Sequence, residues 1–320
     1  YCNLLKVICN VEKITLMIIR PPKLNSGDKV GIIAPAGPVN KRQLEKGLEV
    51  VSEMGFEPIL GNFVHERSRF LAGTDSRRAK DIMDMVRNRE IKAIFCARGG
   101  YGANRILNHL DAKVIRKNAK IFVGSSDITL LLHYLHLKVG VLAFHGPMSA
   151  GSFGRSPMKT SREQFKNILM GKPTSYFCRK AKVFSKGSAV GKITGGCLTL
   201  LCRSLGTPYD IQTHNRILFI EDVNEPFYKL DGMLWQLKAA GKFKRVRGII
   251  FGEMVNCNPQ KPGDGKLENI LSDLFPKPDI PILTHCPIGH SNEIWTLPFE
   301  TQATLNTSIK TLELKNCGVK

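Results

Sequence analysis

The chain has 320 residues, enough for one large domain or for two, and its 42% hydrophobic and 23% charged residues are ordinary for a globular protein. No stretch approaches the roughly 18 uninterrupted apolar residues of a membrane span, so we expect no membrane partner. A total of 47 Lys and Arg against 27 Asp and Glu gives a net charge of +20. Because the lysines are scattered, we expect a compositional bias rather than a nucleic-acid partner.

The cysteine pattern bears on compartment and on metal binding. There are nine cysteines, an odd number, and no CxxC pair occurs. Several lie in apolar runs, as Cys96 does in "AIFCARGG", which favours free thiols in a reducing cytoplasm over a disulfide scaffold. No HxH, HExxH or His/Cys cluster has ligand spacing, so we expect neither a metal nor a cofactor.

The first 27 residues are predicted to be an extension and a lead-in. Charged residues such as Lys6 and Glu12 interrupt the apolar runs, and no small-residue cleavage site follows. Organised sequence begins after Met17. We therefore expect residues 1–16 to have no role in the fold.

Residues 28–150 alternate between strand and helix patterns. Asn40 and Thr74 are predicted to cap two amphipathic helices. The apolar runs lack period-2 alternation, which is typical of strands buried on both faces of a parallel sheet. This predicts an open, doubly wound α/β domain whose ligand loops follow the strands. The three loops are "APAGP", "CARGGYG" and "GSSD".

The remainder predicts a second, less regular domain. Residues 151–187 are interpreted as a linker with one helix near residues 161–170. Residues 188–310 combine strand and helix patterns with a Pro-, Gly- and Thr-rich end, and predict a mixed α/β, β-rich domain. Residues 311–320 are expected to be a tail.

Ser126 is a candidate nucleophile in "FVGSSDIT". It follows an apolar strand and Gly124, at the start of a predicted helix, where a sharp turn exposes a side chain to backbone N–H groups. The pattern is G-x-S-D rather than G-x-S-x-G, and a helix cap alone would also explain a serine here.

Other candidates lie in later turns. The glycines of "ARGGYG" allow close backbone approach and free N–H groups, although a phosphate loop or a plain tight turn fits as well. Glu221 and Asp222 end an apolar strand, where a carboxylate can orient a histidine or merely cap a turn. His290 lies in a turn-rich stretch, and a lone histidine is often structural.

The order of nine segments is more specific than any one of them. They are "GIIAPAGPV", "FLAGTDSRRAKDI", "ARGGYGANRIL", "VGSSDITLLL", "HGPM", "GGCLTLL", "LGTPYD", "FIEDVNEPFYKLDGMLWQL" and "PIGHSNEIWTLP". Together they closely resemble the LD-carboxypeptidase family, the muramoyltetrapeptide carboxypeptidases, which includes the microcin C self-immunity peptidases. The resemblance covers about Asp28 to Leu305.

The resemblance implies a metal-independent serine peptidase with a Ser126–Glu221–His290 triad. It also implies an oxyanion hole formed by the backbone N–H groups of Asp127 and Gly100. Arg98 would contact a substrate carboxylate, unless it forms a structural salt bridge.

Three positions depart from the family pattern, which puts substrate preference and local packing in doubt but leaves the triad intact. Cys197 stands where Asn is commoner, Gly232 where Arg often follows Asp, and Glu300 where Gly is usual.

We expect hydrolysis of murein tetrapeptide to tripeptide and D-alanine by a cytoplasmic homodimer. The alternatives are a peptidase that cleaves a peptidyl-nucleotide, for which Trp295 would be a stacking residue unless it packs in the core, and a non-catalytic protein that binds an acidic ligand.

Overall fold

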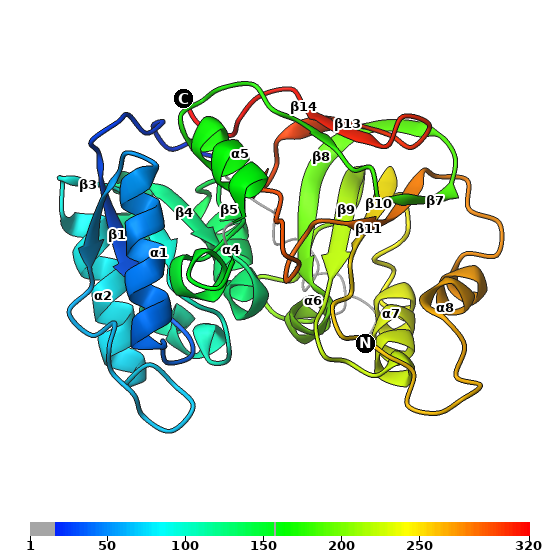
Figure 1. Cartoon of the computed structure of the whole chain (residues 1–320), viewed down its shortest axis with the longest axis horizontal. Helices are drawn as coiled ribbons and strands as arrows, with labels where there is room; N and C mark the ends of the chain where they lie inside the picture. The colour runs from blue at the N-terminus through cyan, green and yellow to red at the C-terminus, as the bar shows by residue number, and fades with distance from the viewer. Residues whose placement is uncertain (1–16, 157) are drawn as a thin grey trace, which may run out of the picture.

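The computed structural model describes residues 17–156 and 158–320, so the expectation about residues 1–16 lies outside the described residues. Two β-sheets lie side by side, one on the left and one on the right of Figure 1. Helices α4 (Thr129–Tyr134), α5 (Lys159–Leu169) and α6 (Leu198–Ser204) lie in the middle of that view. No helix within the described residues is long and apolar enough to cross a membrane.

The first sheet has six strands in the order β12-β5-β4-β3-β1-β2. Five of them run parallel, and only β12 is antiparallel to its neighbour β5. The strands are β1 (Lys29–Ile33), β2 (Glu57–Leu60), β3 (Ile91–Cys96), β4 (Ile121–Gly124), β5 (Phe144–His145) and β12 (Leu297–Pro298). The predicted open, mostly parallel α/β sheet is confirmed.

The strand order determines on which face of the first sheet each helix lies. The chain moves from β1 through α1 (Lys41–Glu53) to β2 and then returns through α2 (Asp75–Arg87) to β3. Because such crossovers are right-handed, this reversal places α1 and α2 on opposite faces. It also leaves a switch point between β1 and β3, where ligands bind in such sheets.

Local sequence accounts for both helices. The Asn40 side chain accepts a hydrogen bond from Gln43 N, and Thr74 accepts one from Arg77 N, so both predicted caps are confirmed. The predicted apolar face of α2 is buried. Between β3 and β4 the chain forms a 3₁₀ helix, η1 (Ala103–His109), and then α3 (Ala112–Lys117).

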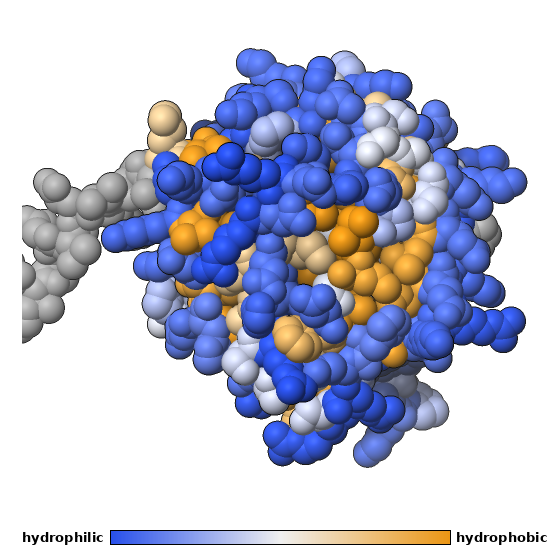
Figure 2. All heavy atoms as spheres, turned by 90° about the vertical axis from the view of Figure 1, so that its left-hand side faces the viewer, coloured by the Kyte–Doolittle hydropathy of each residue, from blue (hydrophilic) through white to orange (hydrophobic). Residues whose placement is uncertain are grey.

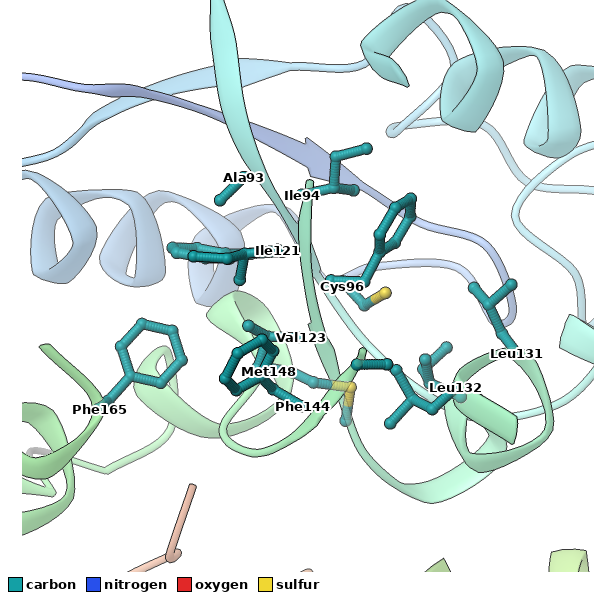
Figure 3. Packing of buried hydrophobic residues seen from close by; sticks show 14 of the residues in the cluster. Ala93, Ile94, Cys96, Ile121, Val123, Leu131, Leu132, Phe144, Met148 and Phe165 are labelled. Carbon is teal, nitrogen blue, oxygen red and sulfur yellow. The ribbon is translucent and has the colours of Figure 1, made fainter. Parts of the chain in front are cut away.

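The core of this unit lies between the sheet and its helices. In Figure 3, Val123 of β4 and Phe144 of β5 lie between Phe165 of α5 and Leu132 of α4. Phe165 of α5 makes an edge-on contact with Phe95, at 5.1 Å between ring centroids. Figure 2 shows the side of the molecule at the left of Figure 1, where hydrophilic residues surround a smaller hydrophobic area.

The second sheet has eight strands in the order β6-β14-β13-β8-β9-β10-β11-β7. The central strands β8 (Ser188–Cys197), β9 (Arg216–Glu221), β10 (Gly248–Gly252) and β11 (Ile282–Cys286) are parallel. Strands β6 (Ser175–Phe177), β7 (Lys182–Ser185), β13 (Gln302–Asn306) and β14 (Thr311–Leu314) pair antiparallel. With α7 (Phe227–Ala239) and α8 (Leu267–Leu274), this is the predicted mixed, β-rich unit.

Segments expected to be peripheral contribute to the fold. Residues 151–187 contain α5 and also β6 and β7, which pair at the two edges of the second sheet. The expected tail contains β14, and Lys320 N donates to Pro21 O. In the lead-in, Ile19 bridges to Val141 and Leu24 is buried.

The chain crosses between the sheets twice near its end. It leaves β11 of the second sheet, passes His290, and pairs as β12 with β5 of the first sheet. It then returns to the second sheet as β13. The segment that carries His290 is therefore anchored on both sheets.

Candidate active site

Ser126 lies at the turn after β4 in a backbone conformation that favours glycine. Its φ is +59°, whereas Ser125 is extended with φ of −151°. The left-handed conformation costs about 1–2 kcal/mol in a residue with a Cβ. Ser126 is partly exposed, while Ser125 is buried. The turn thus presents Ser126 and hides Ser125, as in a nucleophile elbow.

The glycine loop after β3 packs directly against this serine. A Cβ on Gly99 would lie 2.8 Å from Ser126 Cβ and 2.9 Å from its Oγ. Gly100 has φ of +108°, and the carbonyl of Gly99 accepts a hydrogen bond from Gly37 N at 3.0 Å. The loops after β1, β3 and β4 therefore meet at the switch point.

Asp127 joins the serine turn to the glycine loop. Its carboxylate accepts a hydrogen bond from Ala103 N at 2.8 Å. Burial raises the pKa of Asp127 to about 6, against the opposing effect of that hydrogen bond. In the part of the chain that the structure describes, the backbone N–H groups of Asp127 and Gly100 donate to no protein acceptor. Both remain available to an anionic oxygen.

Glu221 and His290 are in direct contact. His290 Nδ1 lies 2.7 Å from Glu221 Oε2, and Glu221 is buried at the end of β9. Burial would lower the pKa of His290, but the charge of Glu221 and its hydrogen bond raise that pKa above its ordinary value. Because the carboxylate accepts from Nδ1, the neutral imidazole carries its lone pair on Nε2.

Two glycines allow this contact. Gly289 has φ of +89°, and a Cβ there would lie 2.0 Å from Glu221 Oε2. A Cβ on Gly252 would lie 2.8 Å from Glu221 Cβ. Neither position accepts a side chain while Glu221 keeps its place beside His290.

A chain of contacts connects the two halves of the site. Cys197 N donates to Thr129 Oγ1 at 3.3 Å, so the start of α4 touches the end of β8. Cys197 is also paired with Glu221 in the parallel register of β8 and β9. The structure thereby brings the turn of Ser126 and the pair of Glu221 and His290 to adjoining ends of the two sheets.

Asp222 has the structural role that sequence reasoning left open. Its Oδ2 accepts hydrogen bonds from the backbone N and the hydroxyl of Thr199, at 2.9 and 2.8 Å. Its Oδ1 accepts from Val223 N at 2.8 Å. Burial and the charge of Glu221 raise the pKa of Asp222. Asp222 holds the end of β9 against the start of α6.

The three departures from the family pattern differ in consequence. The thiol of Cys197 donates to Asp222 at 3.5 Å, and an added Cβ on Gly232 would have nothing within 4 Å. Glu300 has φ of +56° and accepts from Arg216 Nε at 2.5 Å. Nothing in the structure links Gly232 to the site.

Arg98 and Arg155 are two cations beside this site. The sequence singled out Arg98 but gave no signal for Arg155, which lies in the segment interpreted as a linker. The charge of Arg155 opposes the rise in the pKa of His290. Among the described residues, no group of three or more His, Cys, Asp or Glu side chains is arranged to hold a metal ion.

The fold and these groups define a two-unit α/β protein with a serine at a strained turn and a histidine–glutamate pair. Comparisons with known proteins agree with this description. Residues 30–146 match the LD-carboxypeptidase N-terminal domain, and residues 190–305 match the LD-carboxypeptidase C-terminal domain. The chain belongs to the LD-carboxypeptidase family, peptidase family S66.

Individual relatives cover nearly the whole chain. A probable murein peptide carboxypeptidase of Bacillus subtilis is 37% identical over 91% of this chain and 93% of its own. The microcin C7 self-immunity protein MccF of Escherichia coli is 26% identical over 90% and 93%. The crystal structure of muramoyltetrapeptide carboxypeptidase from Oxalobacter formigenes is 29% identical, covers 89% of this chain and 97% of its own, and superposes with a TM-score of 0.79.

Proposed function

We propose that this chain is a serine-type LD-carboxypeptidase that releases D-alanine from murein tetrapeptide. The observation that carries the proposal is the hydrogen bond from His290 to buried Glu221, located at the ends of strands that adjoin the turn of Ser126. The family and the names of the relatives support a peptide substrate with a free terminal carboxylate.

In the proposed mechanism, His290 Nε2 takes the proton of Ser126, and Oγ attacks the carbonyl carbon of the L-centred residue. Glu221 holds the imidazole in the required tautomer and stabilises the imidazolium. The N–H groups of Gly100 and Asp127 stabilise the oxyanion. His290 then protonates the leaving D-alanine nitrogen, and water hydrolyses the acyl-enzyme by the same route in reverse.

We also propose that the protein is a cytoplasmic homodimer. Each subunit would contain two domains, residues 28–150 and residues 188–310. The cysteines in the described part of the chain are all free, which suits a reducing compartment. Tyr228 and Trp235 are exposed seven residues apart on α7, and such aromatic side chains are enriched at protein interfaces. Light scattering after gel filtration measures the assembly state.

The relative MccF keeps cleavage of a peptidyl-nucleotide as the alternative reaction. Trp295 does not favour it, because this residue is buried and stacks on Tyr176 with ring centroids 4.8 Å apart. The tryptophan therefore belongs to the core and is not presented to a nucleotide base.

One assay distinguishes these functions. Purified protein is incubated with murein tetrapeptide and, separately, with a peptidyl-adenylate analogue, and the products are measured by mass spectrometry. We expect D-alanine from the first and little product from the second. The reverse would favour the immunity-type reaction. Loss of both, without labelling by a fluorophosphonate probe, would favour a non-catalytic binding protein.

A further inference from the structure

Arg98 and Arg155 carry positive charges that no acidic side chain neutralises in the described part of the chain. Each is held by a backbone carbonyl instead. Arg98 Nη1 donates to Pro38 O at 2.7 Å, and Arg155 Nε donates to Gly151 O. These bonds orient the guanidinium groups and leave most of their five N–H donors free.

The backbone segments that carry the two arginines are hydrogen-bonded to each other. The carbonyl of Ala97 accepts hydrogen bonds from Ala150 N at 2.9 Å and from Gly151 N at 2.8 Å. Arg98 follows Ala97 directly, and Arg155 is anchored on Gly151. Because Gly99 abuts Ser126, this junction lies next to the proposed nucleophile.

Electrostatic effects agree with this placement. Arg155 is exposed as a residue, but partial burial of its guanidinium lowers its pKa, and the charge of Arg98 lowers it further. The charge of Arg155 also acts on His290. Both effects have the sign that a position of Arg155 near Arg98 and the proposed general base would give, which agrees with the backbone junction at Ala97.

The chemistry of the leaving group favours a cation beside His290. In an LD-carboxypeptidase, His290 protonates the nitrogen of the departing D-amino acid. The carboxylate carbon of that residue lies only about 2.5 Å from the nitrogen, because a single Cα separates them. The carboxylate must therefore lie beside His290, and a guanidinium binds a carboxylate through paired, charge-assisted hydrogen bonds.

We propose that Arg155, together with Arg98, forms the subsite that binds the terminal carboxylate of the substrate. The inference rests on the proposed function and adds the group that restricts cleavage to the last residue. A peptide that continues beyond the scissile bond, or ends in an amide, leaves both cations without a partner.

The test compares tetrapeptide with its C-terminal carboxamide in the wild type and in Arg155→Gln. The wild type should prefer the free acid by about tenfold to a hundredfold in kcat/KM. Arg155→Gln should lose that factor for the acid and keep its rate for the amide. Arg155→Lys keeps the charge without the planar guanidinium. Its preference for the free acid should lie between that of the wild type and that of Arg155→Gln.

Arg89→Gln is the matched control, since Arg89 is exposed near the opposite, amino-terminal edge of the first sheet. It should retain the wild-type preference. The labelling rate by a fluorophosphonate probe reports an intact Ser126 in each variant. An equal loss of kcat/KM for both substrates, or an unchanged acid preference in Arg155→Gln, would overturn this inference but leave the proposed function standing. Absence of D-alanine release from the wild type would overturn the proposed function and this inference with it.

Discussion

Ser125 and Ser126 are adjacent but differ in the properties that decide reactivity. Ser126 is partly exposed in a left-handed turn against Gly99, whereas Ser125 is extended and buried. We expect Ser126→Ala to lower kcat by roughly 10³-fold or more, because it removes the proposed nucleophile. Ser125→Ala should retain activity and cost on the order of 1 kcal/mol of stability.

Steady-state release of D-alanine measures the activity of both variants, and mass-spectrometric mapping of a covalent serine probe identifies which serine reacts. The two variants are matched, since they remove the same hydroxyl one residue apart. A probe on Ser125, or a fully active Ser126→Ala protein, would contradict the assignment.

The contact of His290 with Glu221 predicts a pH profile. Protonated His290 cannot act as a base, so kcat/KM should fall as pH decreases through the pKa of His290, which Glu221 raises. Glu221→Gln removes the charge that favours the imidazolium. Its acidic limb should move to lower pH, while kcat falls by about 10³- to 10⁴-fold because the tautomer is no longer fixed.

Full pH–rate profiles of the wild type, Glu221→Gln and the exposed control Glu45→Gln test this expectation. The control should reproduce the wild-type limb. If the limb of Glu221→Gln remains at the wild-type pH, the titrating group is not His290.

At the scale of elements, the loop after β3 and the turn after β4 form one packed unit. The atom nearest to a Cβ on Gly99 would be Ser126 Cβ, at 2.8 Å, so Gly99→Ala must displace Ser126. We expect kcat to fall by at least about 100-fold, since a shift of 1 Å can cost that much. Overpacking should also lower the free energy of unfolding by about 1–3 kcal/mol.

Gly232→Ala is the matched control on α7, where nothing lies within 4 Å of the added Cβ. It should leave kcat unchanged and stabilise the helix by up to about 1 kcal/mol. Urea unfolding and D-alanine release are measured on both. A Gly99→Ala enzyme with wild-type kcat would show that the glycine loop does not position Ser126.

Elements with a local signal were predictable from the sequence. The strands β1, β3 and β4 are apolar runs, and α1 and α2 begin at capping residues, so pattern alone identified them. The short edge strands β6 and β7 mix polar and apolar residues and depend on partners far along the chain. No local pattern encodes such pairing, which explains why their segment was interpreted as a linker.

The candidate site was likewise predictable only in part from local sequence. Local sequence indicated exposed positions after strands but left a cap, a turn or a structural histidine open at each one. The resemblance to a family, and not the pattern, selected Ser126, Glu221 and His290. The contact of Glu221 with His290 arises from the crossing between β11 and β12 and has no local signal. The triad itself and the bounds of the two domains stay predictions.

At the scale of the whole molecule, Glu300 joins the two sheets. It lies between β12 of the first sheet and β13 of the second. Its carboxylate contacts His136 of the first unit at 3.5 Å and Arg216 of the second at 2.5 Å. Lys192 of β8 is 3.2 Å away. Burial would raise the pKa of Glu300, but His136 and Arg216 hold that pKa well below its ordinary range.

Because the folded pKa is depressed, the stability that Glu300 contributes is present above its unfolded pKa of about 4.3 and is lost as pH falls below it. Glu300→Gln keeps the shape and removes the charge, leaving Arg216 partly buried without its partner. We expect about 2 kcal/mol less stability at pH 7, a value reduced for the exposure of Lys192. The difference from the wild type should narrow as pH falls below about 4.

Urea unfolding at a series of pH values, with Glu45→Gln as an exposed control, measures this dependence. Glu300→Gly separates the ion pairs from the backbone, because glycine adopts the positive φ of this position without strain while losing the same charge. It should be more stable than Glu300→Gln by up to about 1 kcal/mol, because the strain of a positive φ is relieved. A pH-independent difference between the wild type and Glu300→Gln would show that the charge of Glu300 does not hold the two units together.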